Sequence, residues 1–288
     1  MTQHDEQQHE RSARPGPGSA DAGAGAAGVR ILSTGGPTAL IELGGVRLVT
    51  DPTFDAPQDY VSPSGAKLTK TEPAALGPAA LGRVDAVLLS HDQHPDNLDR
   101  SGRAFLAEVP LVLTTTGGAG RLGAGDGAVA AEGLAPWDVH ELARPDGGVL
   151  TVTAVPALHG PEGFEERTGQ VIGFVLSGEG LPSVYVSGDN ASLAHVRQIA
   201  ERCGPVDTAV VFAGAACVPA IYGEALLTLD SAQAAQAARI LGARRAVVLH
   251  CDSWAHFTED FADVRTAFDG AGLGATLSAT RHGRVYEP

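Results

Sequence analysis

The chain has 288 residues, of which 43% are hydrophobic, so it is long and apolar enough to bury a sizeable core. Its formal net charge of −14 argues against nucleic acid as a partner, because an acidic surface repels phosphate groups at long range. The three cysteines stand at irregular spacing and form no Cys-x-x-Cys pair. This spacing argues against a disulfide framework and against a thiolate zinc knuckle.

Residues 1–28 are rich in Gln, Ala, Gly, Ser and Pro and carry almost no large apolar side chains, so we expect a disordered tail. This segment has neither the basic start nor the apolar stretch of a signal peptide. No run of about 18 apolar residues occurs, which predicts a protein without a membrane span. We therefore expect a cytoplasmic protein with one folded domain, residues 29–288.

The folded domain begins with three predicted strands, at residues 29–33, 38–43 and 46–50, which glycine-rich turns separate. The apolar run at 85–89 is typical of a strand buried on both faces. A helix is predicted at 103–108, and strands follow at 111–114, 149–155, 171–176 and 183–186. Then come a helix at 192–201, a strand at 208–212 and an Ala-rich helix at 231–241, with Asp230 or Ser231 as its N-cap. A strand at 246–249 and a helix at 259–268 close the chain.

These elements are strands first, then strand–helix alternation, with strands again in the middle and helices in both halves. Sheets and amphipathic helices must each bury an apolar face against another layer. The order therefore predicts an α/β fold of two mixed β-sheets packed face to face, with helices on the outer faces.

A dense polar cluster, Ser-His-Asp-Gln-His-Pro-Asp-Asn-Leu-Asp at residues 90–99, directly follows the buried strand at 85–89. Imidazole and carboxylate groups packed this closely suit zinc, manganese or iron. The alternative is a polar loop that caps the next helix, with Asp96 or Asn97 as the N-cap.

Three further polar groups also follow predicted strands. His159 comes after the strand at 149–155, Asp189 lies in a Gly-Asp-Asn turn, and His250 ends the strand at 246–249. Taken alone, each has a structural explanation, such as a buried histidine or a common turn. Together they lie where rigid scaffolds present functional groups.

In chain order these groups, with Asp51 after an early strand, resemble the metallo-β-lactamase superfamily across residues 29–286. The likeness is greatest to its lactonase-like and phospholipase-like hydrolases, whose terminal signature the segment 247–257 resembles. The resemblance implies a four-layer αβ/βα sandwich.

The metal-binding loop of that superfamily reads His-x-His-x-Asp-His. Anchored on Asp96, this sequence reads Asp92-x-His94-x-Asp96-Asn97, so that Asn97 replaces the last histidine. Anchored on the end of the strand, His91 takes the first histidine's place, with one extra residue before His94.

The resemblance implies a divalent metal centre of one or two ions, zinc first, with manganese or iron as alternatives. Asp189 matches the family's bridging carboxylate, and Asp51 the early aspartate that orients the loop. The choice between His91 and Asp92 stays open at one position. The implied ligands are His91 or Asp92, His94, Asp96, His159, Asp189 and His250.

The function that this resemblance implies is hydrolysis of a small ester, lactone or phosphodiester by metal-activated water. Asp96 would accept a proton, and His256 would grip the substrate or donate a proton. For His256 the alternative is a histidine at a helix start, packed beside Trp254. The pocket walls are expected from residues 54–71, 160–168 and 218–227, and the partner is a small-molecule substrate.

Two other functions stay open, because a fold does not fix a function. One is a non-catalytic scaffold whose weakened site binds a ligand or a partner, which Asn97 and the extra loop residue motivate. The other is a mononuclear-iron oxygenase. The sequence does not define the oligomeric state.

Overall fold

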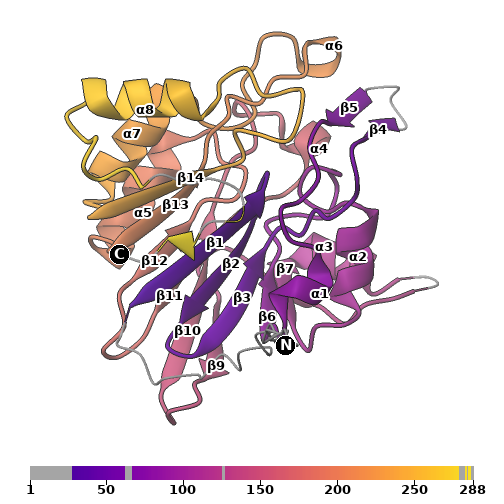
Figure 1. Ribbon diagram of the computed structural model, residues 1–288, viewed down its shortest axis with the longest axis vertical. Helices are drawn as coiled ribbons and strands as arrows, with labels where there is room; N and C mark the ends of the chain where they lie inside the picture. Colours follow the sequence, from indigo (N-terminus) through magenta and orange to yellow (C-terminus); the bar gives the residue numbers. More distant parts are fainter. Residues whose placement is uncertain (1–27, 62–66, 125–126, 279–282, 284, 287–288) are drawn as a thin grey trace, which may run out of the picture.

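The computed structural model describes residues 28–61, 67–124, 127–278, 283 and 285–286 (Figure 1). The expected tail, apart from Gly28, therefore lies outside the described residues, and the division of the chain at this point stays a prediction. Among the described residues, no helix has the length and apolar character needed to cross a membrane.

Two large sheets and a separate hairpin contain the strands. The first sheet has the order β15-β1-β2-β3-β6-β7-β8, the second has the order β14-β13-β12-β11-β10-β9, and β4 pairs with β5. The strands of the first sheet are β1 (Val29–Gly35), β2 (Thr38–Leu43), β3 (Val46–Thr50), β6 (Ala86–Leu88), β7 (Val112–Thr115), β8 (Glu132–Leu134) and β15 (Val285–Tyr286). Those of the second are β9 (Val139–Ala143), β10 (Val149–Pro156), β11 (Ile172–Ser177), β12 (Val184–Val186), β13 (Thr208–Phe212) and β14 (Arg245–Leu249). The hairpin strands are β4 (Gln58–Val61) and β5 (Lys67–Lys70).

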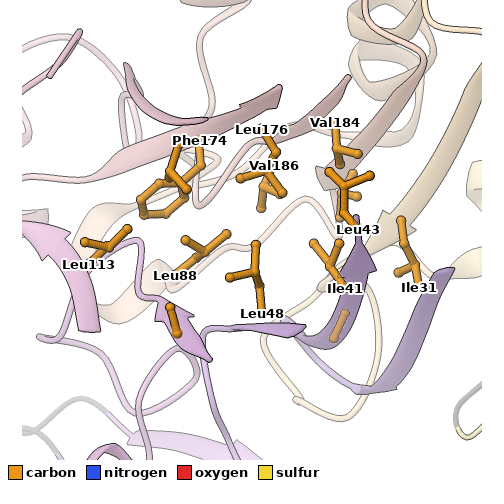
Figure 2. Packing of buried hydrophobic residues seen from close by; sticks show 14 of the residues in the cluster. Ile31, Ile41, Leu43, Leu48, Leu88, Leu113, Phe174, Leu176, Val184 and Val186 are labelled. Atoms are coloured by element: carbon orange, nitrogen blue, oxygen red, sulfur yellow. The ribbon is translucent and has the colours of Figure 1, made fainter. Parts of the chain in front are cut away.

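The two sheets pack face to face through aliphatic side chains, which alternate along the strands and so fall on one face. Figure 2 shows Ile41, Leu48 and Leu88 of the first sheet opposite Phe174 and Leu176 of the second. All five are at most 1% exposed. Full burial of one such side chain contributes about 1.5–3 kcal/mol, so this layer is the main source of stability between the sheets.

Helices cover the outer faces and complete a four-layer sandwich, as the sequence predicted. The helices α5 (Leu193–Cys203), α7 (Ser231–Ile240) and α8 (Phe261–Gly270) pack on the second sheet. The first sheet is covered by α1 (Pro78–Leu81), α2 (Arg100–Leu106) and α3 (Thr116–Leu122). The remaining helices, α4 (Glu165–Thr168) and α6 (Pro219–Tyr222), lie in Figure 1 at the same end of the molecule as β4 and β5.

The start of α2 corrects the sequence analysis, which placed this helix at 103–108. The helix begins at Arg100, and its N-cap is Asp99, whose side chain accepts a hydrogen bond from the Gly102 amide at 2.7 Å. Neither Asp96 nor Asn97 caps it. The cap falls at Asp99 because the side chains of Asp96 and Asn97 are buried in the cluster described below. For α7 the N-cap is Asp230, one of the two predicted candidates.

Gly102 makes the closest approach between α2 and the loop after β3. A Cβ atom at this position would lie 1.8 Å from the Pro52 carbonyl oxygen. We expect Gly102→Ala to lower the free energy of unfolding by about 1–3 kcal/mol, because the helix must shift to relieve the overlap. Thermal unfolding measures this. The matched control is Gly120→Ala in α3, where a Cβ meets nothing within 4 Å and removing glycine should be neutral or stabilising.

Candidate metal centre

The polar groups singled out from the sequence meet at one edge of the two sheets. In the first sheet, β3 and β6 run parallel and end at Asp51 and at the loop 90–99. In the second, β10, β12 and β14 point in the same direction, because β11 is antiparallel to both its neighbours and β12 to β14 are parallel. Loops at the carboxyl ends of such strands form the crevice where α/β folds bind ligands.

Two turns at this edge are held in strained backbone conformations. Asp51 has φ of 28° and His250 has φ of 59°, which is the left-handed region that side chains other than glycine rarely adopt. The His250 amide donates a hydrogen bond to the Gly36 carbonyl at 2.9 Å, which fixes the turn. Such strain costs on the order of 1–3 kcal/mol and is concentrated at functional sites.

Three histidines form the first of two ligand groups. The Nε2 atom of His91 lies 3.0 Å from Nδ1 of His94, and Nε2 of His159 lies 3.1 Å from the same nitrogen. The His159 Nδ1 atom donates to the Leu227 carbonyl at 2.8 Å, so in the neutral imidazole Nε2 carries the lone pair. The Nδ1 atom of His94 holds at most one hydrogen, so it cannot donate to both neighbouring nitrogens. At least one of the two nitrogen–nitrogen contacts therefore brings two lone pairs together. A cation at this point would turn that repulsion into coordination.

The tautomer of His91 follows from its neighbours. The Ser90 hydroxyl donates to Asp51 Oδ2 at 2.8 Å and lies 3.0 Å from His91 Nδ1, so this nitrogen donates to the hydroxyl. His91 therefore turns the lone pair of Nε2 toward the other histidines. Burial raises the pKa of Asp51 to about 7. Asp51 also accepts a hydrogen bond from the Ser90 amide at 2.6 Å and so acts on the loop through Ser90, a role that no sequence pattern indicated.

Burial also sets the charge of the histidines in this first group. It lowers the pKa of His91 well below its ordinary value and that of His94 to about 4. Both imidazoles are therefore neutral near pH 7, which is the form that binds metal ions.

Asp96, Asp189 and His250 form the second group. The Nε2 atom of His250 lies 3.5 Å from Asp96 Oδ2 and 3.4 Å from Asp189 Oδ1. Their donor atoms lie within 4.8 Å of one another, as do those of the three histidines. Asp189 lies between the two groups, because its other oxygen, Oδ2, is 3.7 Å from His159 Nε2.

Several buried atoms of the second group have no hydrogen-bond partner among the described residues. They are Asp96 Oδ1, Asp189 Oδ2 and both ring nitrogens of His250. Burial alone would lower the pKa of His250, but the carboxylates of Asp189 and Asp96 raise it to about 10. Burial would likewise raise the pKa of each aspartate, but the neighbouring histidines hold both below the ordinary value. Buried, unpaired donor atoms with this charge pattern fit a divalent cation.

The structure distinguishes between His91 and Asp92, which the loop spacing left open. His91 is fully buried beside His94, whereas Asp92 turns away and pairs with Arg121 of α3, the closest contact being 2.5 Å. Asp92 is therefore wrong as a member of the cluster. Arg121 stands far away in sequence, and no local pattern could have indicated it.

His256 lies beside the second group but faces a cavity. Its Nε2 is 3.0 Å from Asp96 Oδ2, and its ring contacts Phe257 at 4.5 Å between centroids. It precedes α8, which begins only at Phe261, so the helix-start part of the alternative is wrong, whereas its ring does pack beside Trp254, at 6.3 Å between centroids. The cavity has a volume of about 340 Å³, and its walls come mainly from the three predicted segments and the loop 90–99. Its lining residues are Tyr60, Val61, Leu68, Gln93, His94, Pro95, Asp96, His159, Arg167, Ala216, Val218, Ile221, Tyr222, Leu227 and His256.

Comparisons with known proteins agree with this arrangement. A family model described as the Beta-lactamase superfamily domain matches residues 46–251. An uncharacterized protein of Mycobacterium tuberculosis is 31% identical over 184 residues, which cover 62% of this chain and 46% of that protein. The N-acyl-phosphatidylethanolamine-hydrolyzing phospholipase D 1 of Caenorhabditis elegans is 29% identical over 189 residues, which cover 62% of this chain and 51% of the relative. The chain thus spans about half the length of the curated relatives it matches.

A solved structure shows the same fold over most of the chain. The isothiocyanate hydrolase from Delia radicum gut bacteria superposes with a TM-score of 0.73 at 18% identity. The superposition covers 89% of this chain and 98% of that one. The predicted four-layer fold is confirmed by this likeness and by the sheets and helices of the structure.

Proposed function

The chain belongs to the metallo-β-lactamase superfamily, and on that premise we propose that it is a metal-dependent hydrolase of a small ester, lactone or phosphodiester. The observation that carries the proposal is the meeting of six buried or partly buried imidazole and carboxylate side chains in two groups, of which His94, Asp96 and His159 line a cavity. Ligand cavities of enzymes have this character, with apolar walls and a few convergent polar groups.

In this proposal His91, His94 and His159 hold one divalent ion, and Asp96 and His250 hold a second, with Asp189 between them. Zinc is the first choice for imidazole ligands. Bound divalent ions of this kind acidify water and polarise a carbonyl or phosphoryl oxygen. Ser90 and Asp51 orient the loop through His91, and the Leu227 carbonyl orients His159.

The catalytic roles go to Asp96 and His256. Asp96 has one buried oxygen without a partner, which can take up a proton released at the floor of the cavity. His256 stands on the cavity wall, with Nε2 3.0 Å from the other oxygen of Asp96. A protonated imidazole at this position can hydrogen-bond the leaving group and donate a proton to it.

The cavity walls favour an uncharged substrate with an aliphatic chain. The lining includes Val61, Leu68, Val218, Ile221 and Leu227, so an alkyl group would lose contact with water there.

Cations near the cavity already contact other groups among the described residues. The Arg167 guanidinium lies over the rings of Phe164 and Tyr222, at 5.2 and 4.8 Å, and donates to the Ile221 carbonyl. On the hairpin, Lys67 pairs with Asp59 at 2.8 Å, and Lys70 pairs with Asp99 at 3.0 Å. A carboxylic ester or lactone therefore fits these walls better than an anionic phosphodiester.

The test is a series of 4-nitrophenyl esters from acetate to hexanoate, with bis(4-nitrophenyl) phosphate as the phosphodiester that carries the same chromophore. We expect kcat/KM to rise about fourfold for each added methylene, because burying one contributes about 0.8 kcal/mol. Spontaneous hydrolysis changes little along this series, so the rise reports contact with the walls.

Leu68→Arg should abolish the dependence of kcat/KM on the length of the ester chain and raise kcat/KM for the phosphodiester. The matched variant Leu68→Met should keep the dependence on chain length. A flat ester series with faster phosphodiester cleavage would contradict the preference for esters. Failure of the metal-loaded protein to hydrolyse either class would contradict the hydrolase itself.

A further inference from the structure

The two ligand groups differ in their chemistry. The first consists of the ring nitrogens of His91, His94 and His159, whereas the second consists of two carboxylates and the imidazole of His250. Imidazole suits zinc, while carboxylate oxygens suit harder ions such as manganese. The chain therefore presents one nitrogen-rich and one oxygen-rich half-site, which share only Asp189 between them.

Asn97 gives the second half-site its oxygen-rich character. It is fully buried, and its amide nitrogen lies 3.3 Å from Asp51 Oδ2 and 3.2 Å from Asp189 Oδ1. The ionised Asp189 carboxylate accepts hydrogen bonds only, so the side chain turns its NH₂ group, which has no lone pair for a metal, toward the cluster. Where an imidazole would add a nitrogen ligand, Asn97 holds two carboxylates in place instead.

His256 does not supply the nitrogen that this half-site lacks. Its Nε2 approaches Asp96 Oδ2, but it is not part of the group of donor atoms that lie within 4.8 Å of one another. Two donor atoms on one ion at about 2.0–2.2 Å cannot lie farther apart than about 4.4 Å. Asp96, Asp189 and His250 therefore remain the protein ligands of the second half-site, with one nitrogen among them.

We propose that this chain builds a centre of two unlike ions, with zinc at the three histidines and an exchangeable, oxygen-preferring ion such as Mn²⁺ at Asp96, Asp189 and His250. This inference rests on the metal-dependent site proposed above. Asn97 is the positioning residue that produces the difference, because it withholds an imidazole from one half-site and orients the carboxylate that both half-sites share.

The experiment is metal analysis of the full chain, independent of any activity. The zinc-loaded protein is dialysed against Mn²⁺ in excess with a weak zinc chelator, and each metal is counted by mass spectrometry. Electron paramagnetic resonance then reports the environment of the bound Mn²⁺. We expect one zinc and one manganese per chain. In Asn97→His, both ions should remain zinc, with the zinc affinity of the second half-site raised roughly 10–100-fold, as single changes around metal ligands produce.

Two further variants keep the proposal falsifiable if Asn97→His does not fold. His250→Ala should lose the manganese and keep the zinc, whereas His91→Ala should weaken zinc binding more than manganese binding. Two zinc ions that resist exchange equally in the wild-type chain would overturn the proposal of unlike ions while leaving the hydrolase intact. A chain that binds no metal under any of these conditions would overturn both.

Discussion

Replacing Asp189 by alanine is expected to lower the metal content at both half-sites and to reduce hydrolysis more than roughly 100-fold. The reason is its place between the two groups, with Oδ1 3.4 Å from His250 Nε2 and Oδ2 3.7 Å from His159 Nε2. Changes to groups that merely support ligands already cost roughly 10–100-fold in affinity or activity, so loss of a shared ligand should exceed that range. Metal per chain and kcat/KM are the two measurements.

Asp92→Asn is the matched control for this variant. Asp92 lies in the same loop as His91 and His94, but it pairs with Arg121 outside the cluster. The control should therefore retain its metal. If Asp189→Ala kept full metal content, or if Asp92→Asn lost as much metal, the assignment of ligands would be wrong.

Replacing Lys70 by methionine is expected to lower the free energy of unfolding by about 3–5 kcal/mol, because it leaves the charge of Asp99 buried without a partner. The Lys70 and Asp99 side chains are 2% and 0% exposed, and their charged atoms are 3.0 Å apart. Asp99 also accepts a hydrogen bond from the Asp55 amide at 2.7 Å and caps α2. The pair thus joins the hairpin β4–β5 to the loop that carries the histidines. Urea unfolding measures the loss.

A double-mutant cycle gives the decisive comparison for this pair. Lys70→Met combined with Asp99→Asn should cost less than the sum of the single changes, since neither charge is then left alone. Lys67→Met is the control, because the Lys67–Asp59 pair is about half exposed and should contribute less than about 1 kcal/mol. Strict additivity of the two buried changes would contradict a coupled ion pair.

The central strands could be predicted from the sequence because their signal is local. Runs such as 38–43, 46–50 and 208–212 alternate or concentrate β-branched and aliphatic residues, and the structure has strands with the same bounds there. The strands β4, β5, β8, β9 and β15 were missed. They are short or exposed, as in β9, where alternate residues face solvent, so tertiary pairing rather than local hydrophobicity defines them.

The candidate site could be predicted as far as strand ends could be located. His94, Asp96, His159, Asp189 and His250 meet as expected, because each follows a strand whose carboxyl end lies at the same edge. The register of the loop 90–99 could not be predicted, since one extra residue leaves two alignments, neither of which matches the family's loop throughout. A long-range contact, Arg121 with Asp92, fixes it. The ligand roles themselves stay proposals until metal is measured.

The donor side chains and the cavity walls come from different parts of the fold, which affects how substrate preference can change. The donor side chains are attached to the rigid ends of two sheets, whereas most of the cavity wall comes from three segments far apart in sequence. The segment 160–168 contacts the segment 218–227 through the rings of Phe164 and Tyr222, 5.9 Å apart, and through the contacts of Arg167 with Ile221 and Tyr222. Insertions or exchanges in these segments can therefore alter which molecules enter while the reactive floor is inherited unchanged.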